Sequence, residues 1–238
     1  MYDNSASPID FSHGLFGRLR AETAADWQHY VNHPFVQQLG AGTLPHAAFR
    51  RYLTQDYLFL VHFARAYALL VTKFHTLPEI RAAAGSLNNI VAELPLHVGY
   101  CAGWGLNETQ MEREPEATET INYTRYVLDI GHSGDALELL AALLPCVAGY
   151  AEVGLRLLAD PATVLEGNPY ASSMQNYSDQ GYPDGVKAAV EQHAAVAQQR
   201  GADARFDRLR ETFTTATRPG GPFCRTALNA GATPGNAS

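Results

Sequence analysis

Cys146 is the residue whose type and setting point most directly to covalent chemistry. It follows Pro145 in an apolar run. A proline inside a helix removes one backbone hydrogen bond and clashes with the carbonyl four residues earlier, so the pattern predicts a kink beside the thiol. Tyr150 lies four residues further on, on the same helical face. A thiolate in this setting can act as a nucleophile; the alternative is an inert buried cysteine that packs as a small apolar side chain.

Asp56 is the second candidate, because it places a carboxyl group on the apolar face of a predicted helix. Phe59 and Phe63 follow it by three and seven residues on that face. A buried carboxylate is costly unless it is paired or hydrogen-bonded. Asp56 therefore either recognises a cationic or amidine-like ligand, or forms a structural ion pair with an arginine or a hydrogen bond with a tyrosine hydroxyl.

Tyr123 and Tyr177 are candidates for ligand binding. Each joins an apolar ring to one polar tip, which suits stacking on a flat heterocycle and hydrogen bonding to it. Ordinary core packing is the alternative reading for each of these tyrosines, and the sequence pattern leaves both readings open.

Metal-ligand spacing is poor along the whole sequence. Glu93 and His97 are four residues apart with Pro95 between them, whereas di-iron bundles repeat Glu-x-x-His on two helices. His29 and His33 form one HxxxH pair at the end of a predicted helix, and neither HExxH nor a phosphate-binding glycine loop occurs. We therefore expect no metal and no cofactor.

The elements that position these residues are all predicted to be helices. Apolar residues recur with a 3.6-residue period, without convincing strand alternation or an internal repeat. We expect about eight helices in one all-α domain over residues 1–230, and a flexible tail at 231–238. A capping-box pattern begins one helix at Asp135, and Asp160 with Pro161 ends it. The other predicted helices span residues 15–31, 43–70, 79–101, 118–130, 170–177, 186–197 and 205–217.

Composition and charge exclude several classes of partner. The 238 residues carry 24 acidic and 17 basic side chains, and the net charge of −7 argues against binding to nucleic acid or an anionic membrane. The three cysteines lie far apart, as in a reduced intracellular protein. The N-terminus lacks a signal-peptide pattern, and the apolar stretch at 57–71 is too short to span a bilayer. We expect a cytoplasmic location.

Several stretches together resemble the thiaminase II (TenA) family over residues 12–223. The most specific are His-Pro-Phe-Val at 33–36 and Leu-Ala-Ala-Leu-Leu-Pro-Cys at 140–146, with further matches at 42–45 and 55–57. The resemblance implies a haem-oxygenase-like helical bundle without haem, assembled as a homotetramer. It also implies hydrolysis of aminopyrimidines such as 4-amino-5-aminomethyl-2-methylpyrimidine, and in many members cleavage of thiamin, in thiamin salvage.

The same resemblance implies a role for each candidate residue. Cys146 looks like the family nucleophile, and Asp56 looks like the aspartate that binds the pyrimidine ring and its amino group. Tyr150 resembles the tyrosine beside the nucleophile. The remaining pocket positions are matched by aromatic residues, namely Phe59, Tyr123 and Tyr177.

One position departs from the family pattern. Gly220 stands where the family carries an acid/base glutamate, three residues before Phe223 and Cys224. Loss of a general acid or base costs roughly 10²–10⁴-fold in rate. Either another carboxyl group substitutes, with Glu93 and Glu152 as candidates, or the chain is a diverged, weakly active or non-catalytic binder of a pyrimidine-like molecule. A metal-dependent oxygenase and a transcription regulator are weaker alternatives.

Overall fold

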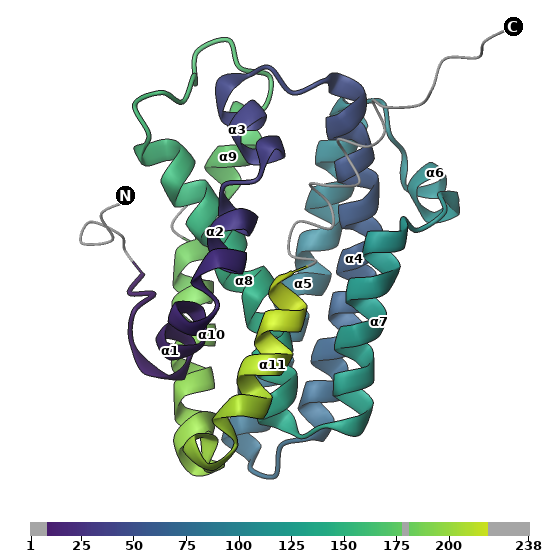
Figure 1. Ribbon diagram of the computed structural model, residues 1–238. Helices are drawn as coiled ribbons and strands as arrows, with labels where there is room; N and C mark the ends of the chain where they lie inside the picture. Colours follow the sequence, from purple (N-terminus) through teal and green to yellow (C-terminus); the bar gives the residue numbers. More distant parts are fainter. Residues whose placement is uncertain (1–8, 178–180, 219–238) are drawn as a thin grey trace, which may run out of the picture. The chain divides into compact units, whose positions relative to one another are not determined.

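The computed structural model describes residues 9–177 and 181–218, and every regular element in these ranges is a helix (Figure 1). The predicted all-α class is therefore confirmed. The described chain falls into two compact units, one formed by residues 44–136 and the other by 9–43 with 137–218. The prediction of a single domain over 1–230 stays a prediction.

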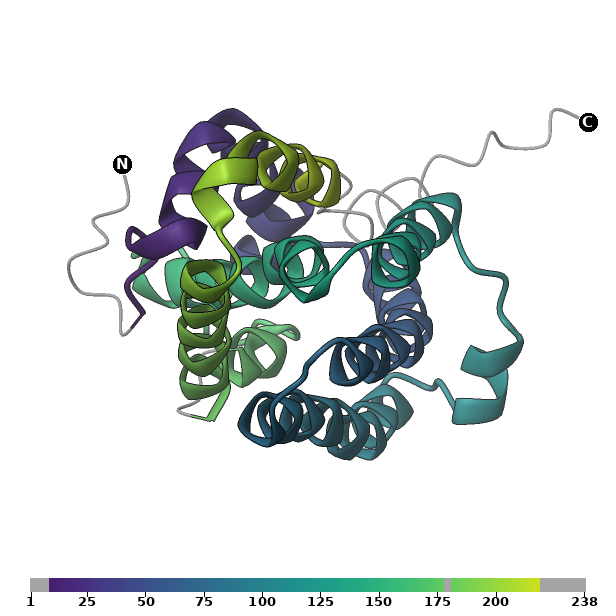
Figure 2. The ribbon, with the colours of Figure 1, turned by 90° about the horizontal axis from the view of Figure 1, so that it is seen from below.

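The unit of residues 44–136 is built on two long neighbouring helices. Helix α4 (His46–Thr72) packs along α5 (Leu77–Gly103) on one side and α7 (Thr118–Ser133) on another, as Figure 1 and Figure 2 both show. The short helix α6 (Glu108–Arg113) lies between α5 and α7 in the chain and contacts α4. The buried face of α4 supplies most of the unit's aromatic core: Phe49, Tyr52, Tyr57, Phe59, Phe63 and Tyr67.

Two capping boxes define where α5 and α6 begin. The Thr76 hydroxyl accepts a hydrogen bond from the Glu79 backbone, and the Glu79 carboxylate accepts one from the Thr76 backbone. Asn107 and Gln110 form the same reciprocal pair at the start of α6. Both arrangements satisfy backbone N–H groups that the first helical turn would otherwise leave without partners.

The other unit packs its helices around a cluster of aromatic rings. Trp27 stacks on Phe213 with ring centroids 5.9 Å apart and an interplanar angle of 14°. Phe16 meets both rings edge-on. These rings bring together α1, α2 and α11. The helices of this unit are α1 (Gly14–Glu22), α2 (Ala24–Val31), α3 (Pro34–Ala41), α8 (Ala136–Ala159), α9 (Ala171–Asn176), α10 (Gly181–Gln199) and α11 (Phe206–Thr217), with the 3₁₀ helix η2 (Ala202–Arg205) before α11.

Three boundaries near the N-terminus differ from the sequence-based prediction. The segment 15–31, predicted as one helix, divides into α1 and α2 at Thr23, whose hydroxyl bonds the Leu19 carbonyl. Residues 34–41 form the additional helix α3, which ends at Gly42 with a positive φ of 70°. Helix α4 begins at His46 with Pro45 as its N-cap, later than the predicted start at residue 43. Prolines at helix starts thus mark both α3 and α4.

Helix α8 carries Cys146 and is continuous from Ala136 to Ala159, through Pro145. Its predicted end before Asp160 is confirmed, whereas the kink at Pro145 stays a prediction. Within the described residues, α8 is the one helix long and apolar enough to cross a membrane, yet 78% of its most apolar window is buried. Core helices of globular proteins pass the same test of length and composition.

Candidate functional site

The six predicted site residues divide equally between the two units. Asp56, Phe59 and Tyr123 belong to the unit of residues 44–136, and the other three belong to the second unit. The second group consists of Cys146, Tyr150 and Tyr177. The residues on which the departure from the family pattern rests, Gly220, Phe223 and Cys224, lie outside the described residues.

Asp56 lies on the buried face of α4 with 5% of its surface exposed. Within the described part of the chain, its one basic partner is His97 of α5, whose Nδ1 lies 3.7 Å from Asp56 Oδ2. Neither an arginine nor a tyrosine hydroxyl contacts the carboxyl group there, so neither structural alternative considered from the sequence is found. Burial raises the pKa of Asp56 to about 7. A buried carboxyl group with a raised pKa and without such partners is available to bind a ligand.

A polar row on α5 faces Asp56. Glu93, His97 and Cys101 recur every four residues and therefore lie on one side of the helix. Desolvation, together with the charge of Asp56, raises the pKa of Glu93, although the residue as a whole is exposed. The same two causes raise the pKa of the Cys101 thiol to about 12. No group of three or more potential ligands in the described ranges has the arrangement of a metal site.

The hydrogen bonds of His97 define its tautomer. Its Nε2 lies 3.1 Å from the carbonyl oxygen of Leu53, which can only accept, so Nε2 carries the hydrogen. The neutral ring then presents Nδ1 to Asp56 as an acceptor. The 3.7 Å separation would permit an ion pair, but burial lowers the pKa of His97 and raises that of Asp56 to about 7. Between the two pKa values the pair therefore holds a single proton, which resides on Asp56.

Aromatic rings stand beside Asp56 on the next turn of α4. The ring of Phe59 lies 4.8 Å from that of Phe63 and 5.8 Å from that of Tyr123 on α7, measured between centroids. All three side chains are buried. The predicted pocket residues Phe59 and Tyr123 are thus in contact across the α4–α7 packing.

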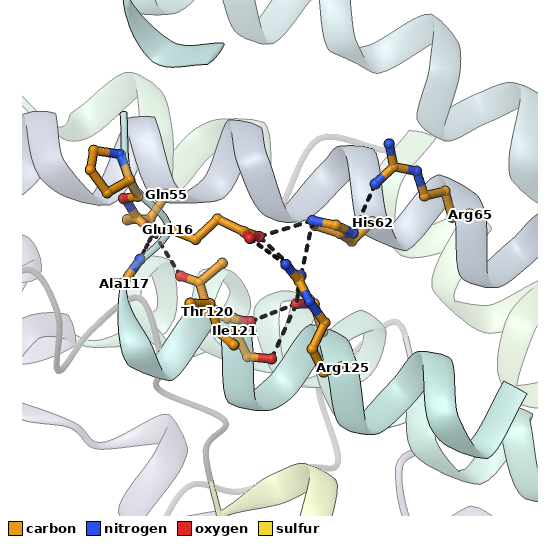
Figure 3. A network of polar contacts seen from close by, with 10 residues as sticks. Gln55, His62, Arg65, Glu116, Ala117, Thr120, Ile121 and Arg125 are labelled. Carbon is orange, nitrogen blue, oxygen red and sulfur yellow. Dashed lines mark hydrogen bonds and ion pairs between the residues drawn. The ribbon is translucent and has the colours of Figure 1, made fainter. Parts of the chain in front are cut away.

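A polar network holds the start of α7 against α4 (Figure 3). The side-chain oxygen of Gln55 accepts hydrogen bonds from the Ala117 backbone and the Thr120 hydroxyl, each at 2.8 Å. Glu116 pairs with His62 of α4 at 2.9 Å and also with Arg125. The network keeps α7, and with it Tyr123, in place along α4. Sequence reasoning did not identify Gln55, since a single buried glutamine carries no motif.

In the other unit, Cys146 and the two tyrosines lie on or against α8. Cys146 is a partly exposed cysteine, one turn before Tyr150. The Tyr150 and Tyr177 rings are 5.1 Å apart, and Tyr177 contacts Tyr182 at 5.3 Å. The structure therefore brings the Tyr150 and Tyr177 rings together, while the roles predicted for them stay predictions.

Two glycines of α8 allow these close contacts, and sequence reasoning missed both. A Cβ atom at Gly149 would lie 2.2 Å from a ring carbon of Tyr30, and one at Gly154 would lie 2.8 Å from the Cβ atom of Tyr177. Any larger residue would push the neighbouring side chain away. Glycines spaced between apolar residues inside a predicted helix are the signal that could have identified these contacts.

Glu152, one of the two candidate replacement acids, is engaged in a structural cluster. Its carboxylate accepts hydrogen bonds from Arg20 at 2.8 Å, from Arg156 at 2.7 Å and from the Trp27 indole at 2.9 Å. The side chain is 1% exposed. Three donors therefore occupy both oxygens of this carboxylate, and it is poorly placed to exchange protons with a substrate. Glu93 remains the better candidate of the two.

The geometry defines a class of fold that known structures share. A protein of Silicibacter sp. TM1040 called a TenA family transcription regulator superposes with a TM-score of 0.85 at 42% identity, over 90% of this chain and 96% of that one. A domain of Shewanella denitrificans with a heme oxygenase-like fold superposes with a TM-score of 0.69 at 15% identity, over 94% of each chain. The fold is therefore the haem-oxygenase-like helical fold that the resemblance implied.

The chain belongs to the TENA/THI-4/PQQC family, whose model matches residues 20–223. A Haemophilus influenzae protein is 38% identical over 192 residues, which cover 81% of this chain and 88% of that protein. The aminopyrimidine aminohydrolase of Halalkalibacterium halodurans is 35% identical over 57% of this chain and 61% of its own length. That of Bacillus subtilis is 29% identical over 83% of both. The predicted family membership is confirmed.

Proposed function

We propose that this protein is an enzyme that hydrolyses aminopyrimidines of the 4-amino-5-aminomethyl-2-methylpyrimidine type, with thiamin as a further substrate, in thiamin salvage. Relatives named aminopyrimidine aminohydrolase support this class of reaction. The observation that carries the proposal is the state of Asp56: a buried carboxyl group without a guanidinium partner among the described residues, beside the aromatic side chains of Phe59 and Tyr123.

Asp56 suits the edge of an aminopyrimidine. A ring nitrogen next to the exocyclic amino group offers one acceptor and one donor side by side. A carboxylic acid matches both, since its hydroxyl donates and its carbonyl oxygen accepts. Transfer of the proton to the ring gives a carboxylate facing a pyrimidinium, and the hydrogen bonds then become charge-assisted. A protonated ring is also a better sink for electrons.

Cys146 is the proposed nucleophile. Its thiolate forms a bond to the ring carbon next to the one that bears the aminomethyl group, and the electron pair displaced into the ring expels the amine as ammonia. Water then adds its oxygen to the exocyclic methylene and returns one proton to the group that protonated the amine, and loss of the thiolate restores the aromatic ring. Tyr150 and Tyr177 are proposed to orient the ring, because their side chains are packed against each other along α8.

Glu93 is the proposed proton donor to the leaving amine. It would take the role of the family glutamate, whose position is occupied by Gly220 in this sequence. Its pKa is raised, as a general acid near neutral pH requires, and it lies on the α5 face that carries His97. We also propose, from the family resemblance, a cytoplasmic homotetramer; light scattering of the purified chain would report its mass, and a monomer would contradict it.

The nucleophile assignment is tested with Cys146→Ser. We expect ammonia release from 4-amino-5-aminomethyl-2-methylpyrimidine to fall by at least about 10³-fold, while calorimetric binding of the hydroxymethyl product persists. Cys101→Ser is the comparison, since burial raises the pKa of that thiol to about 12 and keeps it protonated. Full activity of Cys146→Ser would overturn the assignment, and binding without ammonia release by the wild type would favour the diverged binder.

A further inference from the structure

His97 joins two parts of the α4–α5 packing that the proposed reaction needs to keep aligned. Its Nε2 donates to the Leu53 carbonyl at 3.1 Å, and its Nδ1 lies 3.7 Å from Asp56 Oδ2. Leu53 and Asp56 are three residues apart on α4, so one imidazole contacts two successive positions on the same helical face. Only 11% of the His97 side chain is exposed.

We propose that His97 is the positioning residue of Asp56: the bond to Leu53 fixes the imidazole with an unprotonated Nδ1 beside Asp56 Oδ2, and the carboxyl group thereby keeps its proton for transfer to an aminopyrimidine. This inference rests on the proposed function, which it deepens by naming the group that controls the proton of the binding site. A backbone carbonyl, rather than a second side chain, sets the tautomer.

The proton transfer conserves atoms and charge. The O–H bond of Asp56 breaks, and an N–H bond forms on the pyrimidine nitrogen next to the amino group. Asp56 then accepts two hydrogen bonds from the pyrimidinium edge. The carboxylate beside Nδ1 favours uptake of a proton from solvent by His97, and the resulting imidazolium balances the charge. Return of one proton to Asp56 and release of the other restore the free site.

The titratable groups next to α4 divide into those that face Asp56 and those that contact other residues of the helix. On α5, Glu93 and Cys101 face Asp56 together with His97. From α6, Glu108 contacts Tyr57 at 3.1 Å. Beside α7, Glu116 and Arg125 contact His62. Tyr57 and His62 follow Asp56 by one and six residues, so these contacts are made elsewhere on α4. The pH response that we assign to His97 is therefore modulated chiefly by Glu93 and Cys101.

Three variants test the proposal by the pH profile of kcat/KM for ammonia release. His97→Phe removes both nitrogens. His97→Gln keeps an N–H for the Leu53 carbonyl and an oxygen as an acceptor, but it cannot take up a proton. His75→Gln is the control, because His75 is an exposed histidine in the link between α4 and α5 and has no part in the proposed site. Melting temperatures are recorded for all three.

The wild type and His75→Gln should lose kcat/KM on the acid side as Nδ1 is protonated, because the imidazolium then holds Asp56 as a carboxylate that has no proton to give. This acid limb should lie below the ordinary histidine range, since burial lowers the pKa of His97. His97→Phe should lower kcat/KM about tenfold or more across the range. His97→Gln should recover most of that loss and lack the acid limb. If His97→Phe does not fold, His97→Gln alone decides.

An acid limb unchanged in His97→Gln, or full activity in His97→Phe, would overturn the role of His97 while leaving the proposed function intact. Failure of the proposed function has a different signature, since the wild type itself would then release no ammonia from the aminomethylpyrimidine at any pH.

Discussion

The two units each bury a carboxyl group, and the two carboxyl groups differ in how many hydrogen-bond donors surround them. Glu152 is held by Arg20, Arg156 and Trp27, and both of its oxygens accept hydrogen bonds. Asp56 has one basic partner among the described residues, the neutral imidazole of His97 at 3.7 Å, and burial raises the pKa of Asp56 to about 7. Both side chains are less than a tenth exposed.

The comparison separates a structural carboxylate from one available to a ligand. A fully paired buried charge stabilises the packing around it, and its removal leaves its partners uncompensated. A poorly paired one costs stability at neutral pH and is typical of a binding or catalytic site. Burial and charge alone do not distinguish the two residues, whereas their hydrogen-bond partners do.

The largest effect is expected for Glu152→Gln, which should lower the free energy of unfolding by about 3–5 kcal/mol, because two guanidiniums lose their carboxylate. Urea denaturation at pH 7.5 measures it. Glu191→Gln, on an exposed position of α10, is the control and should change stability by less than about 0.5 kcal/mol. Equal stabilities for the two variants would contradict the structural role of Glu152.

Asp56→Asn should have the opposite effect on stability. The folded pKa of about 7 lies above the ordinary value of 3.8, so Asp56 favours the folded state at low pH and this contribution is lost as pH rises from about 4 to 7. At pH 8 the variant should be more stable than the wild type, by up to about 4 kcal/mol, while ammonia release falls by about 10²-fold. Urea denaturation at pH 4.5 and 8 measures this difference, with the exposed Asp129→Asn variant as control. An Asp56→Asn variant that is less stable than the wild type at pH 8 would refute the prediction.

A smaller effect, of up to about 3 kcal/mol, is expected from His193 on α10. It is 0% exposed, neither ring nitrogen has a hydrogen-bond partner within the described residues, and burial lowers its pKa to about 4. A depressed histidine pKa gives stability that is complete above about pH 6.5 and is lost as pH falls toward 4.

His193→Leu should therefore become more stable relative to the wild type as pH falls from about 6.5 to 4, whereas exposed His75→Gln should follow the wild type. Because Asp56 and His193 act with opposite signs over nearly the same pH range, their contributions largely cancel in the wild type. Stability curves of the two single variants should slope in opposite directions between about pH 4 and 6.5. Parallel slopes would show that at least one of the two groups titrates normally.

The amino-acid pattern predicted which segments are helical better than it predicted where each helix begins. Long amphipathic segments such as 118–130 and 205–217 reappear as α7 and α11, because periodic apolar spacing is itself the packing requirement. The division at Thr23 and the extra helix α3 were missed. Both depend on local hydrogen bonds and on the proline at a helix start, which the apolar period does not report.

The site shows a similar limit. The resemblance named Asp56 and the pocket aromatics, and it remains the basis for the roles assigned to them. His97 was considered only as an unsuitable metal ligand, since Pro95 interrupts its pair with Glu93. Its contacts with Leu53 and Asp56 join residues of two helices that are more than 40 positions apart in the sequence, 44 positions for His97 and Leu53. Periodicity within one helix carries no information about such a contact.

Gln55 and Asp56 are consecutive, so their side chains leave α4 in directions about 100° apart, one toward the start of α7 and the other toward α5. Deleting or inserting a single residue upstream in α4 would rotate both side chains about the helix axis. The Gln55 amide would then no longer face the start of α7, and the Asp56 carboxyl group would no longer face α5. We therefore expect that, across natural variants, this helix keeps a constant residue count ahead of position 55, and that changes of length gather in the links between helices.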